Sequence, residues 1–411
     1  MAYNAVLLAL DERDLRRRNA LHTATLINTL LFVQTILAGM NPLYREARYL
    51  FLLVVGAVYV LSERWAQRRK LPTIASTHLI LGLLLMTLAI PLKLSDRWAS
   101  FLWTGEVALF VWLGLRYARW SYRLFAFGLA VVIFGRLVSL DFWNSGMIAL
   151  LNWSVPWRVL IGCVGIGSFG AAAACYRLPQ HRKTLKPIEA QAFHLYLFAA
   201  AILIWCLIIA EIDVRWFSAA WAAESTAAML LGFRLKDRAV RLVGAIGCGL
   251  VALWVISVMA LVAAGGNPVE WNRWATACVI ALFYELSLRY RSPAAGERFN
   301  SETRFQDGYA IGASILLTGL LWIDISRQWL SVAWAVEGLA LVAVGFTLRD
   351  KIFRVAGLSV FGLLILKILF MDLAGAETIY RILSFIVAGV ILLLASFAYA
   401  QFTGKQAPRA R

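Results

Sequence analysis

Apolar and polar residues alternate along this chain in long blocks. Apolar runs of about 20 residues, long enough to cross a bilayer as an α-helix, are separated by short polar connections. Fourteen such runs follow one another, and none of the connections is long enough to hold a soluble domain. The pattern therefore predicts an all-α, polytopic transmembrane protein of about 14 helices.

The order of the runs predicts how the chain is organised. We expect an amphipathic segment lying on the cytoplasmic membrane surface at 1–22, a single transmembrane domain at 23–402, and a basic cytoplasmic tail at 403–411. Within the transmembrane domain, we expect a first helix, three repeat units and a last helix, at 23–41, about 44–141, 157–260, 272–373 and 379–402.

The repeat units share one pattern, Trp-x4-Trp-x2-Glu-x7-Gly-x8-Arg, which occurs three times without a gap. Its members are Trp98, Trp103, Glu106, Gly114 and Arg123, then Trp216, Trp221, Glu224, Gly232 and Arg241, then Trp329, Trp334, Glu337, Gly345 and Arg354. Each unit should hold two helical hairpins. Because four spans are an even number, the three units should have the same orientation in the membrane.

Composition and charge agree with the membrane prediction. Hydrophobic residues make up 61% of the chain, charged residues only 15%, and the mean hydropathy is +0.73. Of the 40 lysines and arginines, most lie in the termini and in every second connection, which is the positive-inside pattern. Both termini and the connection 289–307 should therefore be cytoplasmic.

The net charge of +17 could also suggest nucleic acid as a partner. The distribution of the charge argues against it, because the basic residues follow the topology of the membrane and form no separate patch. We therefore expect no nucleic-acid partner. The expected partners are membrane lipids, through anionic headgroups at the cytoplasmic face, and other membrane proteins.

A stretch in the third unit resembles a known family. It contains Trp334-Ala-Val-Glu337-Gly-Leu-Ala-Leu, then Leu348-Arg349-Asp350, then Tyr380-Arg381-Ile-Leu-Ser384-Phe385. This stretch is similar to the C-terminal part of the bacterial membrane proteins designated domain of unknown function 2339. The similarity is strong over about 328–402 and weaker, through the repeats, elsewhere. It implies a bacterial inner-membrane protein with many helices, and it implies no activity.

The glutamate of each repeat is the residue that most needs an explanation. It lies eight residues inward from the first tryptophan, or about 12 Å, at a depth where an ionised carboxylate without a partner costs several kcal/mol. Arg136 and Lys367 each follow a glutamate by thirty residues, on the return helix. The spacing predicts the intramembrane ion pairs Glu106–Arg136 and Glu337–Lys367.

The middle repeat breaks this pattern, because Trp254 and Met259 replace the cation and the aspartate that follows it in the other two. Glu224 should then be uncharged near neutral pH, or paired with a group in another unit. We regard the three glutamates, the two cations and the second tryptophans Trp103, Trp221 and Trp334 as candidate functional or packing residues. Packing is the simpler interpretation, since a site used once need not be built three times.

Signals for enzyme chemistry are weak. The four histidines are dispersed, and the chain has none of the sequence motifs of metalloproteases or serine hydrolases. We expect no catalytic residue, metal or cofactor. The leading hypothesis is a non-enzymatic module that binds or moves a lipid-like or amphiphilic envelope molecule. A scaffold subunit of a larger membrane complex is the alternative, and a membrane-embedded transferase comes third.

Overall fold

The computed structural model describes most of the chain between residues 23 and 372. The described residues are 23–25, 27–29, 31–35, 38, 47–69, 71–144, 146–150, 153–178, 185, 187–290, 303–327 and 329–372. The expected surface segment at 1–22, the helix at 379–402 and the tail at 403–411 lie outside them. The expected first helix is described in part, and its described residues are helical.

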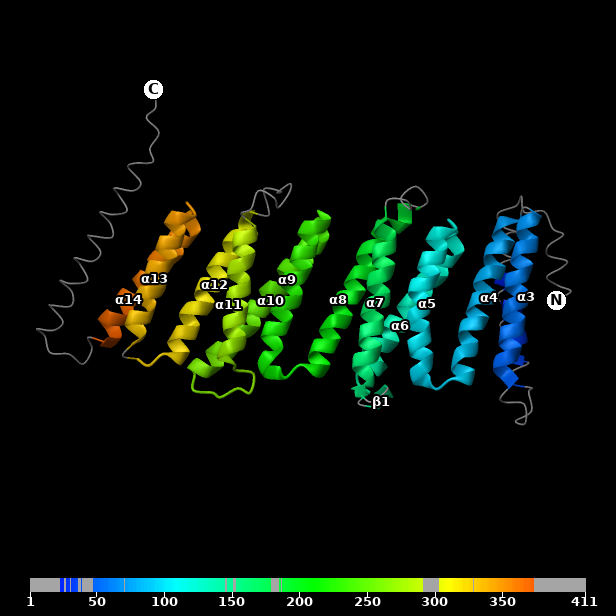
Figure 1. Ribbon diagram of the computed structural model, residues 1–411, viewed down its shortest axis with the longest axis horizontal. Helices are drawn as coiled ribbons and strands as arrows, with labels where there is room; N and C mark the ends of the chain where they lie inside the picture. Colours follow the sequence, from blue (N-terminus) through cyan, green and yellow to red (C-terminus); the bar gives the residue numbers. More distant parts are fainter. Residues whose placement is uncertain are drawn as a thin grey trace, which may run out of the picture. The chain divides into compact units, whose positions relative to one another are not determined.

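Contacts divide the chain into two compact units, Met1–Ile212 and Asp213–Arg411. In the first unit, consecutive helices pack as the hairpins α3–α4, α5–α6 and α7–α8 (Figure 1), and α5 also packs on α7. The bounds are α3 Arg48–Arg68, α4 Pro72–Lys93, α5 Asp96–Arg116, α6 Trp120–Arg136, α7 Trp157–Arg177 and α8 Ala192–Glu211, with the 3-10 helix η4 Pro187–Gln191 before α8.

The second unit repeats the hairpin arrangement. Its pairs are α9–α10, α11–α12 and α13–α14, and a buried core that includes Met229, Phe283 and Tyr290 joins α9 to α12. The bounds are η5 Val214–Trp216, α9 Phe217–Leu235, α10 Arg238–Ala263, α11 Arg273–Arg289, α12 Thr303–Asp324, α13 Leu330–Thr347 and α14 Lys351–Lys367. The middle sequence repeat is thus split, with one hairpin in each unit.

Nine helices among the described residues are long and apolar enough to cross a membrane. They are α3 to α8, α10, α13 and α14. The three remaining helices, α9, α11 and α12, are each paired in a hairpin with a neighbour. The protein is therefore a multi-pass helical membrane protein, as the apolar runs predict.

The motif helices α5, α9 and α13 end in the same way. The residues Ala118, Lys236 and Arg349 adopt positive φ of 52–53°, and each is followed by an amide that donates to the carbonyl of the motif glycine. This is the hydrogen bond of a Schellman C-cap. Left-handed backbone is strained for these non-glycine residues, and the three motif helices therefore share one uncommon C-terminal conformation.

The motif glycine itself is required by close packing. A Cβ on Gly232 would lie 2.5 Å from Cγ and 2.8 Å from the backbone N of Arg241, and Gly114 and Gly345 meet Arg123 and Arg354 in the same way. The arginine of the return helix therefore lies directly across the glycine. This close approach explains why the position is a glycine in all three motifs.

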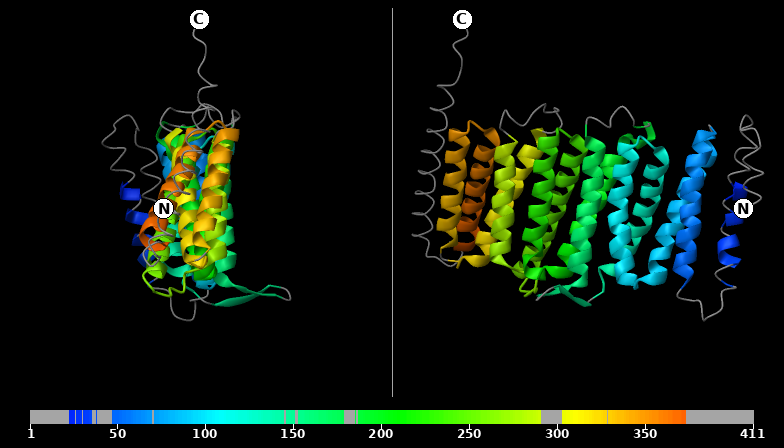
Figure 2. Two further views of the ribbon diagram at one scale, coloured as in Figure 1. Left: turned by 90° about the vertical axis from the view of Figure 1, so that its left-hand side faces the viewer. Right: turned by 45° about the vertical axis from the view of Figure 1, so that its right-hand side comes forward.

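Two features were not predicted. The connection between α6 and α7 forms an antiparallel hairpin of β1 Met147–Leu150 and β2 Trp153–Pro156. This hairpin lies next to the first residues of α7 (Figure 2). In addition, α6 and α14 are each extended by a π-helical turn, η2 Leu137–Asp141 and η7 Ile368–Asp372, directly after Arg136 and Lys367. In the middle repeat α10 continues as an α-helix through the equivalent positions.

Candidate functional site in the membrane-spanning helices

Two of the three motif glutamates contact the hydroxyl of a threonine, and in both cases the carbonyl of that threonine accepts a hydrogen bond from the second motif tryptophan. In the first unit, Thr87 Oγ1 on α4 lies 2.9 Å from Glu106 Oε2, and Trp103 Nε1 donates to the Thr87 carbonyl at 2.9 Å. In the second unit, Thr318 Oγ1 on α12 lies 2.8 Å from Glu337 Oε1, and Trp334 Nε1 donates to the Thr318 carbonyl at 3.2 Å. We call these two arrangements the Thr–Trp–Glu sites.

The glutamates and tryptophans of these sites are candidates from the sequence, whereas the threonines are known only from the structure. A signal was present, because Thr87 and Thr318 both precede their glutamate by 19 residues. In the middle repeat the same position is Trp205. Glu224 is half-buried on α9, and the middle repeat lacks the threonine as well as the cation. The uncharged or cross-paired state predicted for Glu224 stays a prediction.

The predicted ion pairs Glu106–Arg136 and Glu337–Lys367 are wrong. Arg136 Nε donates to Ser100 Oγ at 2.7 Å, and its Nη2 donates to the Asp96 carbonyl at 3.3 Å. Lys367 Nζ donates to Ser331 Oγ at 2.6 Å and to the Arg327 carbonyl at 3.1 Å. Both cations therefore reach the beginning of the motif helix.

The reason is the reach of the two basic side chains. Each serine precedes its glutamate by six residues, or about 9 Å along the helix. Long basic side chains extend toward the membrane–water interface because the charged group is more stable there. The alignment of residues thirty apart correctly placed the cations on the return helix of the same hairpin, but it gave the wrong partner.

The cation of the first unit belongs to a buried polar cluster that we call the Arg136 cluster. It consists of Ser100, Arg136, Asp141 and Trp157. The Asp141 carboxylate accepts from Ser100 Oγ at 3.0 Å and from Trp157 Nε1 at 3.4 Å, and it lies 3.5 Å from Arg136 Nε. The cluster joins α5, the end of α6, the π-turn η2 and α7, so its hydrogen bonds fix the packing of four elements.

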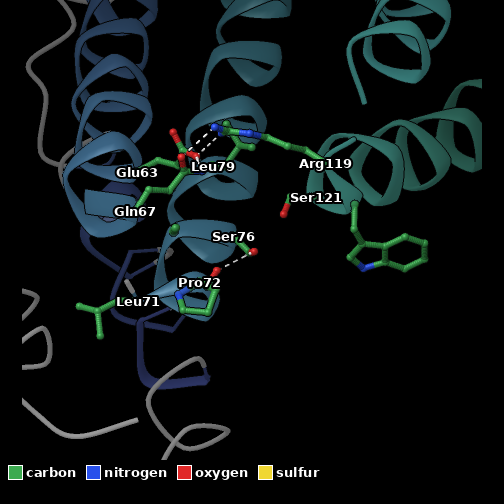
Figure 3. Close-up of a pocket in the computed structure, with 10 residues that line it drawn as sticks. Glu63, Gln67, Leu71, Pro72, Ser76, Leu79, Arg119 and Ser121 are labelled. Atoms are coloured by element: carbon green, nitrogen blue, oxygen red, sulfur yellow. Dashed lines mark hydrogen bonds and ion pairs between the residues drawn. The ribbon is translucent and has the colours of Figure 1, made fainter. Parts of the chain in front are cut away.

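A second group of polar residues lies at the opposite ends of these helices, and its members were not identified from the sequence. Arg119, before α6, donates through Nη1 to Glu63 and through Nη2 to Gln67 Oε1 at 2.8 Å. Glu63 is only 3% exposed. Figure 3 shows Arg119 reaching toward Glu63 and Gln67, which both lie on α3.

These residues line a pocket of about 340 Å³. The lining is part polar and part apolar, and it comes from α3, α4 and α6: Glu63, Gln67, Leu71, Pro72, Ala75, Ser76, Leu79, Arg119, Trp120 and Ser121 (Figure 3). We call it the Arg119 pocket. It lies at the helix ends that adjoin the basic connections after α3 and α5.

Other charged residues near the helix ends are explained by local partners. Glu211 pairs with Arg158, and Asp324 lies 3.9 Å from Arg273. Asp213 caps η5 and binds Arg215 at 2.8 Å, and these hydrogen bonds lower the pKa of Asp213 to about 2. Among the described residues, no three His, Cys, Asp or Glu side chains gather in a way that could hold a metal ion.

The helical hairpins and their buried polar contacts define a polytopic membrane protein. The chain belongs to the family described as "Predicted membrane protein (DUF2339)", whose model matches residues 1–402. The family expected from residues 328–402 is thereby confirmed. Neither the curated proteins nor the solved structures gave a match.

The role of the second tryptophan in each Thr–Trp–Glu site can be tested by mutation. We expect Trp334→Phe to lower the free energy of unfolding by about 1 kcal/mol, because the indole hydrogen bond to Thr318 is lost while most of the ring contact remains. Trp329→Phe, at a position 65% exposed in the same repeat, should change it by less than about 0.5 kcal/mol. Equal effects in detergent unfolding experiments would argue against a specific role for Trp334.

Proposed function

We propose that this protein is a bacterial inner-membrane module that binds an amphiphilic, lipid-like molecule with an anionic headgroup in the Arg119 pocket. The headgroup lies among Arg119, Ser76 and Ser121, and the apolar chain lies along the exposed apolar flanks of the helices. The positive-inside pattern predicts that this end of the helices faces the cytoplasm. The proposal does not depend on transport across the membrane.

The observation that carries the proposal is the identity of residue 119. Asp237 and Asp350 occupy the same position in the other two repeats, and each caps the helix that follows, through hydrogen bonds to backbone amides. Arg119 makes no such cap for α6. Loss of an N-cap costs about 1 kcal/mol. The start of α6 is therefore less stable than it would be with a capping aspartate, and the residue at this position is instead a cation that lines a pocket.

The chemistry of the pocket favours an anionic headgroup. A guanidinium offers five N–H donors and binds phosphate or carboxylate oxygens in pairs. A volume of about 340 Å³ is at the lower end of the range of small-molecule sites, about 300–1,000 Å³. The Glu63 carboxylate already binds Arg119, so an anionic ligand would compete with Glu63 for the same donors.

Binding of a fluorescent phosphatidylglycerol to the detergent-solubilised protein tests the proposal, with phosphatidylcholine as the neutral comparison. We expect Arg119→Met to weaken phosphatidylglycerol binding at least about tenfold, equivalent to about 1.4 kcal/mol. Glu63→Gln should strengthen it, because Arg119 is released from a competing carboxylate. Arg116→Met, three residues earlier at an exposed position, is the matched control and should leave binding unchanged.

Several results would contradict the proposal. Equal binding of the two lipids, equal losses for Arg116→Met and Arg119→Met, or weaker binding by Glu63→Gln would each show that Arg119 and Glu63 only join the helices. A stoichiometric membrane-protein partner, purified together with a chain that has no lipid preference, would favour the scaffold hypothesis in its place.

A further inference from the structure

Glu337 is the most deeply buried of the three motif carboxyl groups. The residue is 5% exposed, whereas Glu106 and Glu224 are half-buried. It lies in the membrane-spanning helix α13, next to Trp334 and Gly338 on the buried side of that helix. Among the described residues, its Oε2 has no hydrogen-bond partner. An ionised carboxylate in this position would cost several kcal/mol.

The oxygen atoms around Thr318 show how many hydrogen atoms are needed to form the hydrogen bonds at this site. Thr318 Oγ1 lies 2.9 Å from the carbonyl oxygen of Ser314 and 2.8 Å from Glu337 Oε1. Both distances are those of hydrogen bonds between oxygens. A threonine hydroxyl has one hydrogen to donate. If Glu337 is ionised, both neighbours are acceptors, and only one of them can receive that hydrogen.

A proton on Glu337 supplies the missing hydrogen. The carboxyl O–H then donates to Thr318 Oγ1, and Thr318 donates to the Ser314 carbonyl, so both contacts are hydrogen bonds. The equivalent site in the first unit differs, because Thr87 Oγ1 makes one such contact, to Glu106, among the described residues. One hydroxyl hydrogen is enough there, whether or not Glu106 carries a proton.

Among the described residues, no cation forms an ion pair with Glu337. Among the described elements, α12 and α14 pack on α13, and Tyr284 of α11 packs against the core cluster that contains Trp334. Lys367 of α14 is directed toward Ser331 and Arg327, and the Tyr284 hydroxyl bonds to Ser314 Oγ at 3.1 Å. The other charged residues of α12 and α14 whose side chains are described lie toward the helix ends: Asp307, Asp324, Lys351 and Arg354.

We propose that Glu337 is a proton-binding site, which holds a proton in the state described here and releases it to water when the pH rises above the titration midpoint of the carboxyl group. A carboxyl group that exchanges a proton at membrane depth is a recurring element of proton-coupled membrane proteins. The proposal rests on the geometry around Thr318 and is independent of ligand binding in the Arg119 pocket. Its failure would therefore leave the proposed function untouched.

Reaction with dicyclohexylcarbodiimide, an apolar reagent that requires a protonated carboxyl group, provides the test. Intact-mass measurement and peptide mapping of the full-length protein in detergent should find one adduct at Glu337 at pH 7. Above the titration midpoint, the adduct should decrease about tenfold per pH unit, because the protonated fraction does. The adduct should be lost in Glu337→Gln and retained in Glu106→Gln.

Infrared difference spectra give a second readout that does not need the variant to be stable. The carbonyl stretch of a protonated carboxyl group should disappear from the wild-type spectrum over the same pH range in which labelling falls. Labelling of the half-buried Glu106 in preference to Glu337 would overturn the proposal, since accessibility alone favours Glu106. The same holds if Glu337 is unlabelled at pH 7 or if its labelling is independent of pH.

Discussion

Replacing Arg123 by methionine is expected to lower the free energy of unfolding by about 3–5 kcal/mol, the usual result of removing one member of a buried ion pair. Arg123 and Glu189 are 2% and 4% exposed, and the two side chains meet through contacts of 2.5 and 3.0 Å. Without Arg123, the Glu189 carboxylate in η4 would be buried without its cation. Reversible unfolding in mixed micelles measures the change.

The double variant Arg123→Met/Glu189→Leu should recover much of this loss, because no charge is then left buried. The pair Arg158–Glu211 serves as the matched control within the same compact unit. Its side chains are 31% and 24% exposed, and water screens their interaction, so Arg158→Met should cost about 0–1 kcal/mol. The expectation fails if Arg123→Met and Arg158→Met are equally destabilising.

Gly114→Ala is expected to destabilise the α5–α6 hairpin strongly. The added Cβ would overlap Arg123 Cγ and would lie 3.0 Å from the backbone N of Arg123, so the clash cannot be relieved by rotating one flexible side chain. Overpacking of this kind costs about 1–3 kcal/mol, and contact with backbone places Gly114 at the upper end. The change should also weaken the Arg123–Glu189 pair, because Arg123 would have to move.

Gly105→Ala in the same helix is the control. A Cβ at Gly105 has no atom within 4 Å, and alanine stabilises an α-helix relative to glycine by up to about 1 kcal/mol. The two substitutions are chemically identical and should change stability in opposite directions. If Gly105→Ala is as destabilising as Gly114→Ala, the close contact with Arg123 does not explain the motif glycine.

Much of the architecture could be predicted from the sequence because it depends on properties that lie along the chain. The length of the apolar runs determines that the helices can cross a bilayer, and short polar connections force consecutive helices into hairpins. The motif also gave Gly114, Gly232 and Gly345 one common position, and the structure shows an arginine across each of them. The assignment to a family of membrane proteins likewise needed only the sequence.

The partners of the polar residues could not be predicted in the same way. Arg123 binds Glu189, 66 positions later, and Arg119 binds Glu63, 56 positions earlier, and neither distance corresponds to a helical or hairpin spacing. The π-turns after Arg136 and Lys367 were not predicted either, although they occur in the two repeats that carry the cation and the aspartate that follows it, and not in α10 of the middle repeat.

The sequence by itself determined that this protein is a multi-pass membrane protein built from helical hairpins, in which a glutamate recurs at one position of three helices. Only the tertiary structure decided that Arg136 and Lys367 bind serines near the helix ends, and that Glu106 and Glu337 bind threonines of the preceding helix. The physical reason is that helix rotation and side-chain reach select a partner within about 3 Å. Spacing along the sequence fixes the depth of a residue only to within a helical turn, about 5 Å.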